Sequence, residues 1–365
     1  MPGARLRRVR TGRAAALGRS AGGPPARTAR PRSWTRASDA QLLKLRLCDL
    51  GLTLESSRLA AHVRRLYREL AGRGIEFRPH VWLAEEWFSP DGVPGIAVPF
   101  YLAHPRLERL ERRIMREVEG GNARWLMRIL RHEAGHALDN AYRLRRRRRW
   151  REVFGPASLP YPHRYRARPG SRRYVHHLGE WYAQAHPTED FAETFAVWLK
   201  PNSHWRTTYA EWPALNKLEL VEELMASVRG RRAPVANRQR VEPIATDTRT
   251  LADVYRRKLA HQRHYRRGLA DHLLGKLFSA AATHPGAVRA STLLRARKTA
   301  LVTAVSRELG IERYSVYQIL RMLIERCEAL KLYVRPGRRH ARPLRSMVAR
   351  LARLYAQGET PHLPL

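Results

Sequence analysis

Residues 131–139 read Arg-His-Glu-Ala-Gly-His-Ala-Leu-Asp and contain the pattern His-Glu-x-x-His. On an α-helix, side chains four positions apart lie one turn above each other on the same face. His132 and His136 can therefore offer two imidazoles to one metal ion, while Glu133 lies beside them and can act on a water held by that ion. A strand would place the two imidazoles too far apart to reach one ion, so the motif requires a helix here and constrains the fold more than any other stretch.

The surrounding sequence favours a helix over residues 122–142. One stripe at steps of three and four contains both histidines, and a second stripe is purely apolar and can face a core. The first stripe is Trp125, Ile129, His132, His136 and Asp139, and the second is Leu126, Leu130 and Leu138. A helix with this motif is typical of zinc hydrolases of the zincin type. The alternative is a chance match, in which the two histidines only pack or cap on a helix.

A third ligand has to come from elsewhere in the chain. A catalytic zinc takes three protein ligands and keeps one position for water, whereas a structural zinc is closed by four. No Cys or third His lies just after His136, so the acids downstream have to complete the site. Glu189, which begins a predicted helix, is the first candidate, with Glu193 and Glu180 as alternatives. Glu193 and Asp139 are also candidates for hydrogen-bonding a ligand histidine and fixing its tautomer.

Two motifs together carry a family resemblance. Residues 188–196 read Thr-Glu-Asp-Phe-Ala-Glu-Thr-Phe-Ala. With residues 132–139, this segment resembles a bacterial family of zinc-binding metallopeptidases whose second motif is Glu-Asp-aromatic-Ala-Glu-Thr-aromatic-Ala. The pair is also similar to the lethal-factor-like branch of the gluzincins. In that branch the first Glu of Glu-x-x-Ala-Glu binds zinc, and a tyrosine seven residues earlier stabilises the transition state.

The resemblance spans about residues 75–225 and implies Glu189 as the third ligand and Tyr182 as the transition-state tyrosine. It departs from the thermolysin pattern, because the second helix lacks the Asn-Glu opening and Glu193 stands where an Asp is usual. It implies a zinc-dependent metallopeptidase that hydrolyses a peptide or protein through a zinc-bound water, with Glu133 as general base. Tyr182 has the alternative of being a packed aromatic.

The predicted fold is α+β and mostly α, and it comprises a zincin-like catalytic domain with a small antiparallel sheet, plus a helical C-terminal domain. The predicted boundaries are a disordered basic tail at 1–37, the metallopeptidase domain at 38–229, a linker at 230–249 and the C-terminal domain at 250–365. The tail has an arginine-rich composition with no apolar period, and the linker contains Arg, Pro, Asn and Thr.

The sheet is predicted from two apolar segments before the metal helix. Residues 77–83 alternate, residues 95–102 form the partner, and Ser89-Pro90-Asp91-Gly92 is the turn between them. Pro99 would confine its strand to a sheet edge, where an extended peptide can bind by main-chain hydrogen bonds. The Pro-, Tyr- and Arg-rich residues 155–175 are interpreted as a flap or rim over the site. His186, His176 and His177 are interpreted as surface or loop histidines.

Charge supports a different class of function. The net charge is +38, from 70 Lys and Arg against 32 Asp and Glu, which predicts attraction to polyanions. Residues 303–320 have the spacing of a helix-turn-helix with Gly310 at the turn, although Ser306 occupies a position usually given to Ala or Gly. The alternative function is therefore a nucleic-acid-binding protein with structural or vestigial zinc. The five arginines 145–149 are either a solvated helix face or a patch for polyanions.

Cysteine usage and hydropathy bear on the compartment. Cys48 and Cys327 lie far apart in sequence and form no metal or redox motif, which favours a reducing compartment. No apolar run approaches the roughly 18 residues of a membrane span. The predicted location is cytoplasmic, with no membrane-spanning segment.

Overall fold

The computed structural model describes residues 33–115, 117–162, 165, 167–179, 181–264, 269–282, 286–335 and 340–357. Helices make up 59% and strands 6% of the structure, which confirms the mostly α class. Most of the predicted basic tail lies outside the described residues. Its last part differs from the prediction, because Ser33–Arg36 form a 3-10 turn and Trp34 is buried, with its Nε1 donating to Leu50 O at 3.1 Å.

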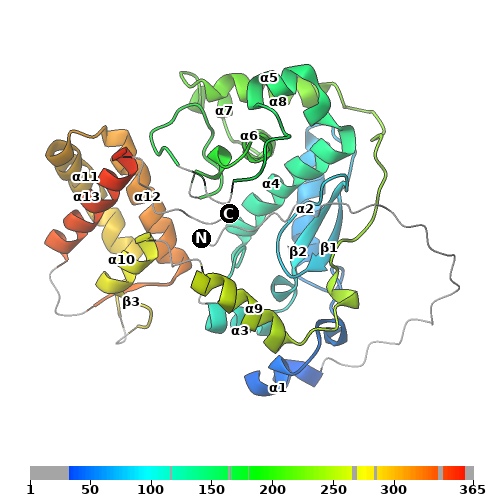
Figure 1. The fold of residues 1–365 in the computed structure, drawn as a ribbon, viewed down its shortest axis with the longest axis horizontal. Coiled ribbons are helices and arrows are strands. Elements are labelled where there is room, and N and C mark those ends of the chain that lie inside the picture. The colour runs from blue at the N-terminus through cyan, green and yellow to red at the C-terminus, as the bar shows by residue number, and fades with distance from the viewer. Residues whose placement is uncertain are drawn as a thin grey trace, which may run out of the picture.

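The elements before and around the metal motif are mainly helices, and their two-stranded sheet lies beside α2 and α4 (Figure 1). They are α1 (Asp39–Leu43), α2 (Leu59–Gly72), β1 (His80–Ala84), β2 (Gly95–Pro99), α3 (Pro105–Met115), α4 (Ala123–Tyr142), α5 (Arg148–Phe154), α6 (Pro187–Leu199), α7 (Trp205–Thr208), α8 (Ala214–Ala226) and α9 (Leu251–His264). The elements that follow are α10 (Leu269–Leu277), β3 (Phe278–Ser279), α11 (Ala290–Leu309), α12 (Arg313–Ala329), β4 (Tyr333–Val334) and α13 (Ala341–Gln357).

The sheet before α4 corrects one prediction. β1 and β2 are parallel, with Trp82 opposite Ala97, so the predicted antiparallel pairing is wrong. The turn at 89–92 does reverse the chain. The residue that it brings opposite β2 is Phe88, which forms an antiparallel bridge with Ala97 on the side of β2 away from β1. β2 therefore has neighbours on both sides, and Pro99 lies at its end instead of on an edge. An antiparallel sheet does exist elsewhere, where β3 pairs with β4.

Helix α4 covers Ala123–Tyr142, so the helix predicted over residues 122–142 is confirmed. The Asn122 side chain caps its start by accepting from the Trp125 N–H at 2.9 Å, and it ends at Arg143 in the left-handed conformation. Residues 129–142 of this helix are all buried. Helix α6 begins with Pro187 in its first turn, where the missing N–H costs nothing, and His186 caps it.

Helices α4 and α6 cross at small residues. A Cβ added to Gly135 would lie only 2.9 Å from Ala192 Cα, so a larger residue there would push the helices apart. The small side chain of Ala192 thus lets α4 approach α6 closely. Phe191 and Phe195 of the same helix are fully buried in the core, and Phe195 also lies close to Gly135. The backbones are thus close enough for side chains from both helices to meet at one point.

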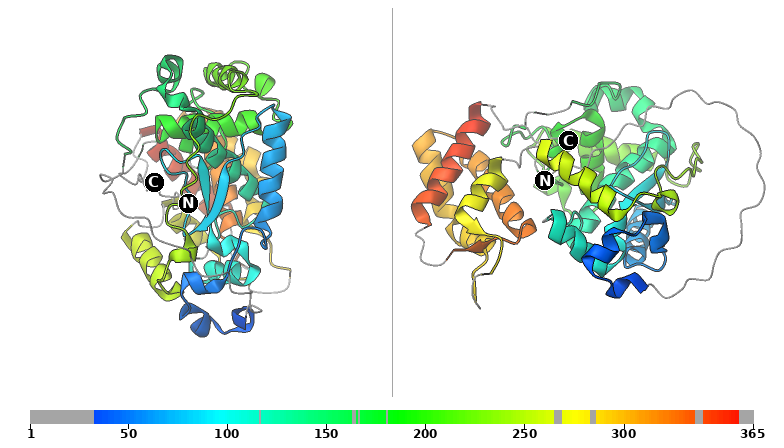
Figure 2. Two further views of the ribbon diagram at one scale, coloured as in Figure 1. Left: turned by 90° about the vertical axis from the view of Figure 1, so that its right-hand side faces the viewer. Right: turned by 60° about the horizontal axis from the view of Figure 1, so that its bottom comes forward.

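The buried hydrophobic residues form two large clusters. One surrounds α4 and α6, and the other is built from α10–α13, which group together on one side of the molecule (Figure 2). Leu251, Val254 and Tyr255 of α9 belong to the first cluster, so the packing divides the chain after α9 and not at residue 250. The segment predicted as a linker packs on the first body, since Trp82 Nε1 donates to Val241 O at 2.9 Å.

No helix in the described part of the chain has the length and the hydropathy that a bilayer crossing requires.

Candidate metal centre

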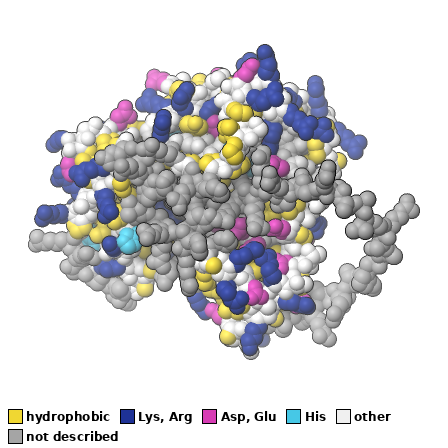
Figure 3. Space-filling view, in the orientation of Figure 1, with side chains coloured by type: hydrophobic (Ala, Val, Ile, Leu, Met, Phe, Trp, Pro, Cys, Tyr) yellow, Lys and Arg dark blue, Asp and Glu magenta, His cyan; other side chains and the backbone are white. Residues whose placement is uncertain are grey.

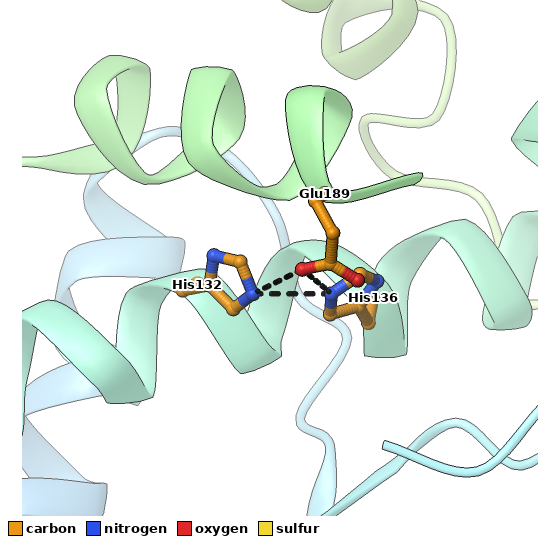
Figure 4. A group of neighbouring side chains, drawn as sticks. All are labelled: His132, His136 and Glu189. Atoms are coloured by element: carbon orange, nitrogen blue, oxygen red, sulfur yellow. Dashed lines mark hydrogen bonds and ion pairs between the residues drawn. The ribbon is translucent and has the colours of Figure 1, made fainter. Parts of the chain in front are cut away.

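Three side chains predicted as ligands meet between α4 and α6 (Figure 4). His132 Nε2 lies 3.2 Å from His136 Nε2, and Glu189 Oε2 lies 3.0 Å from the first nitrogen and 3.3 Å from the second. All three are almost completely buried, with exposed fractions of 1%, 4% and 0%. Two imidazole nitrogens and a carboxylate oxygen therefore converge on one point inside the protein.

The donor set fits a divalent cation. Glu193 Oε1 lies 2.9 Å from His132 Nδ1, so the Nδ1 proton points at that carboxylate and Nε2 keeps its lone pair. Two lone-pair nitrogens 3.2 Å apart and a buried carboxylate need a positive charge among them, and a metal ion supplies it. Imidazole and carboxylate are the ligand types that zinc accepts in catalytic sites.

Glu193 lies on the far side of His132 from the point where the ligands meet. Its second oxygen, Oε2, accepts a hydrogen bond from the Leu178 N–H at 2.7 Å. Both oxygens are therefore engaged, one by the imidazole and one by a backbone amide. The alternative of Glu193 as the third ligand receives no geometric support, and Glu180 lies outside the described residues.

The charges around the histidines favour a bound cation. Burial acts to lower the pKa of His132, but its hydrogen bonds to Glu189 and Glu193 outweigh this and raise the pKa to about 10. Burial likewise acts to raise the pKa of Glu189, and the two histidines overcome it and lower the pKa. The two carboxylates thus strongly favour a positive charge at His132, which a metal ion can supply in place of the proton.

Glu133 lies on the adjacent face of α4 and is only 2% exposed. Its Oε2 has no hydrogen-bond partner among the described residues, although it is buried. The Ser89 hydroxyl donates to the Glu133 backbone oxygen at 3.2 Å and fixes this turn of the helix to the segment beside β2. Burial raises the pKa of Glu133, which makes its carboxylate a better proton acceptor.

Tyr182 lies beside His132 at the start of the 3-10 turn η5 (Tyr182–Gln184). Its ring centroid is 5.6 Å from that of His132, and the two planes are inclined by 47°. Burial and the nearby Glu189 carboxylate raise the pKa of Tyr182 well above its ordinary value. The hydroxyl therefore stays protonated at neutral pH and can donate a hydrogen bond.

Tyr161 also reaches the centre, and the sequence analysis did not identify it. Its hydroxyl donates to Glu189 Oε1 and lies 2.6 Å from Thr188 Oγ1. Its ring stacks on His186 with centroids 3.9 Å apart. The only available signal was its place in the predicted flap, because an irregular segment has no period that singles out one side chain.

Asp139 differs from the prediction. Its carboxylate accepts hydrogen bonds from the backbone N and the Nε of Arg145, at 2.7 and 2.5 Å, and none joins it to His132 or His136 within the described chain. It therefore fastens the turn after α4 and does not orient a ligand. Among the five arginines, Arg145 is largely buried by this contact, while Arg148 stays exposed on the short helix α5.

The three other histidines near the site lie apart from the ligand group, as predicted, but two of them are buried. His186 Nδ1 accepts from the Thr188 N–H at 3.2 Å, which leaves Nε2 to donate to Leu159 O at 3.0 Å. His177 Nε2 lies 2.9 Å from Arg128 O, and the partly buried His176 contacts a tyrosine of α12. They were predicted to be surface or loop histidines, and His177 and His186 are loop residues that lie buried and not at the surface.

Two histidines and one glutamate thus form a buried group that could hold one metal ion, and they lie on a His-Glu-x-x-His helix and on a second helix that crosses it. Residues 106–278 match the model of a family described as "Putative zinc-binding metallo-peptidase". No curated protein and no solved structure shows a significant match to the chain.

The matched region contains α4, α6 and everything between them. The predicted cofactor, zinc, is confirmed by this family description, and the His-His-Glu group supplies a place for it. The description also supports the coarse class of metallopeptidase that the two motifs predicted.

Proposed function

We propose that this protein is a zinc-dependent metallopeptidase of the zincin type, with His132, His136 and Glu189 as ligands and Glu133 as general base. The observation that carries the proposal is the convergence of these three ligand atoms beside the unpaired, buried Oε2 of Glu133. A structural zinc site would have a fourth protein ligand, whereas three ligands and a nearby free carboxylate are the composition of a hydrolytic site.

When bound, zinc acts as a Lewis acid that acidifies a water and polarises the scissile carbonyl. Glu133 takes a proton from the attacking water on its free oxygen and later returns it to the leaving amine. The Tyr182 hydroxyl, kept neutral by its buried position, donates to the oxygen on which negative charge develops. Glu193 holds His132 in the tautomer that leaves Nε2 available. The expected substrate is a peptide or an unfolded protein segment.

The nucleic-acid alternative gains no support from the packing of its proposed helix-turn-helix. The turn at Gly310 is left-handed and α12 follows it, as predicted. Base contacts in such motifs come from the start of the second helix, however, and here Tyr314 packs against Trp212 with ring centroids 5.7 Å apart. On the face drawn in Figure 3, the visible Lys and Arg side chains lie at several separate places.

We include a cytoplasmic location in the proposal, supported by the two cysteines. Cys48 and Cys327 are both free thiols, and the second is buried in the core of the C-terminal helices. Free thiols persist in a reducing compartment.

The decisive experiment is Glu133→Gln, assayed on a denatured protein substrate together with metal analysis. The amide fills the same space but cannot accept the proton, so zinc should stay equimolar while the rate falls by about 10²–10⁴-fold. The wild-type protein treated with a chelator should lose the same activity and regain it on addition of zinc. Wild-type protein that carries zinc but shows no chelator-sensitive cleavage would refute the proposal.

A further inference from the structure

The residue before Tyr182 belongs to a different core from the metal centre. Trp181 is 5% exposed and lies in the hydrophobic cluster built from α10–α13, together with Ala167. Tyr165 packs against the same cluster and lies 6.4 Å, between ring centroids, from Tyr182. The segment 155–182 is called the strap below, and its described residues therefore contact both the metal centre and the C-terminal helices.

The backbone at this point is in a conformation that a bulky residue rarely adopts. Trp181 has φ 55° and ψ 41°, in the left-handed region. A non-glycine residue stays there only when its surroundings determine the conformation. At Trp181 the buried indole fixes this conformation. The chain reverses here and η5 begins, with the Gln184 N–H donating to Trp181 O at 2.9 Å. Trp181 faces the C-terminal cluster while Tyr182 faces His132.

The first half of α12 holds the strap at two more places. The Tyr314 hydroxyl lies 3.2 Å from His176 Nε2. Gly170 approaches the helix so closely that an added Cβ would lie 2.6 Å from Ser315 Oγ. This is the part of the helix-turn-helix pattern that the proposed function leaves without a role, and it is occupied by the strap.

A buried ion-pair group holds the other half of α12 in place. Arg326 is 4% exposed, and it donates to Glu117 at 2.9 Å and to Asp271 at 2.8 Å. Glu117 lies between α3 and α4, and Asp271 lies on α10. Because a buried guanidinium is stable only with its partners in place, this contact fixes the C-terminal helices against the body that contains the metal ligands.

We propose that the C-terminal helices support the active site from outside it, with Trp181 as a positioning residue that docks in their core and thereby holds Tyr182 beside His132. This rests on the proposed function and adds to it a residue and a region that the two sequence motifs do not include. Trp181 itself touches neither the ligands nor the reacting atoms. Its effect passes through the backbone of η5 to the tyrosine.

The test is Trp181→Ala, compared with Tyr182→Phe and with the double variant. Zinc should stay equimolar and KM should change little, while kcat falls towards the value of Tyr182→Phe, a loss of about 10²–10³-fold. The double variant should be no slower than Tyr182→Phe, because a misplaced tyrosine and a missing hydroxyl remove the same interaction. Trp181→Phe, which keeps an aromatic anchor, should recover part of kcat.

A matched control separates positioning from loss of stability. Leu344→Ala removes a side chain that is 1% exposed in the same cluster but on α13, away from the strap. It should lower the melting temperature as Trp181→Ala does, with kcat unchanged at a temperature where both variants are folded. Equal losses of kcat in the two variants, or rate losses that multiply in the double variant, would overturn the proposal.

Hydrogen exchange gives a readout that does not depend on hydrolysis. In Trp181→Ala the amides of η5 should exchange faster, while those of α4 keep their protection. Unchanged exchange in η5 would show that the docking does not hold this turn, and it would refute the inference even if the enzyme is active. If the wild-type protein cleaves no substrate, the proposed function fails, and the exchange measurement alone decides whether Trp181 positions η5.

Discussion

The helix pair α4 and α6 and the strap meet at the same metal centre, but they place their functional side chains in different ways. The pair uses helical periodicity and the close crossing at Gly135 to bring the three ligands together. The described part of the strap ends at Tyr182, the first residue of η5, and places Tyr161 and Tyr182 through contacts with His186 and with the C-terminal helices. The positions of the three proposed ligands therefore depend on local sequence, and the positions of the tyrosines depend on distant residues.

The two regions should therefore respond differently to substitution. Substitutions in the helix pair should change metal content, whereas substitutions in the strap should leave the metal bound and change the rate. A strap residue that removes zinc, or a ligand that spares it, would show that the division is wrong.

The largest effect is expected for Glu189→Ala. Two imidazoles alone do not hold a catalytic zinc, so the dialysed variant should lack stoichiometric metal and all hydrolytic activity. Metal analysis and the cleavage assay measure both. Glu219→Ala, at an exposed position on α8, is the control for loss of a carboxylate and should behave as the wild type. Undiminished zinc in Glu189→Ala would contradict the assignment of this ligand.

Tyr182→Phe should have the next largest effect. Removing one donor to a developing oxyanion lowers kcat by about 10²–10³-fold, and zinc should remain equimolar because the phenol is not a ligand. Steady-state kinetics with metal analysis checks this prediction. Tyr317→Phe, at the surface of α12, is the matched control. If Tyr182 is only a packed aromatic, kcat will be nearly unchanged, since the phenyl ring fills the same space.

Glu193→Gln tests the hydrogen bond behind His132. The amide can still accept from Nδ1 but without the charge, and loss of such a partner typically weakens metal binding by about 10–100-fold. Competition with a chromophoric chelator measures the affinity. A complete loss of zinc here, with zinc retained in Glu189→Ala, would mean that the two glutamates have exchanged roles.

The smallest predicted effect concerns the helix crossing itself. Gly135→Ala places a methyl group against Ala192 and Phe195, and overpacking of this kind costs about 1–3 kcal/mol of unfolding free energy. Urea denaturation of the zinc-free protein measures it. Gly275→Ala is the control, because α10 leaves open space at that position, and it should be neutral or slightly stabilising. Equal stabilities would show that the crossing is less tight than the structure has it.

The sequence predicted the structure best where residues recur at the spacing of a helix. His132 and His136 were predicted from a spacing of four, and α4 and α6 from apolar stripes and a helix-starting proline. The choice of Glu189 over Glu193 needed the family resemblance as well, since both acids lie on one helical face. Only coordinates show that Glu193 reaches the outer nitrogen of His132.

The failures occurred where long-range contacts decide the structure. The turn before β2 was recognised, but turn chemistry does not reveal which earlier segment pairs with the strand, and β1 proved to be parallel. Tyr161 was missed because nothing local to residues 155–175 indicates that one tyrosine reaches Glu189. The role of Trp181 was equally invisible, because its partners lie in a cluster that includes residues more than a hundred positions later.

Glu193 connects the two regions compared above, since one oxygen meets His132 and the other accepts the amide of Leu178 in the strap. A change in the hydrogen bond between Glu193 and His132 must therefore also change the hydrogen bond between Glu193 and the Leu178 amide. Thermodynamic linkage makes the effect mutual. If the ordered strap increases the free energy of metal binding, metal binding stabilises the ordered strap by the same amount. A ligand that lifts the strap from outside would then loosen the metal without ever approaching it.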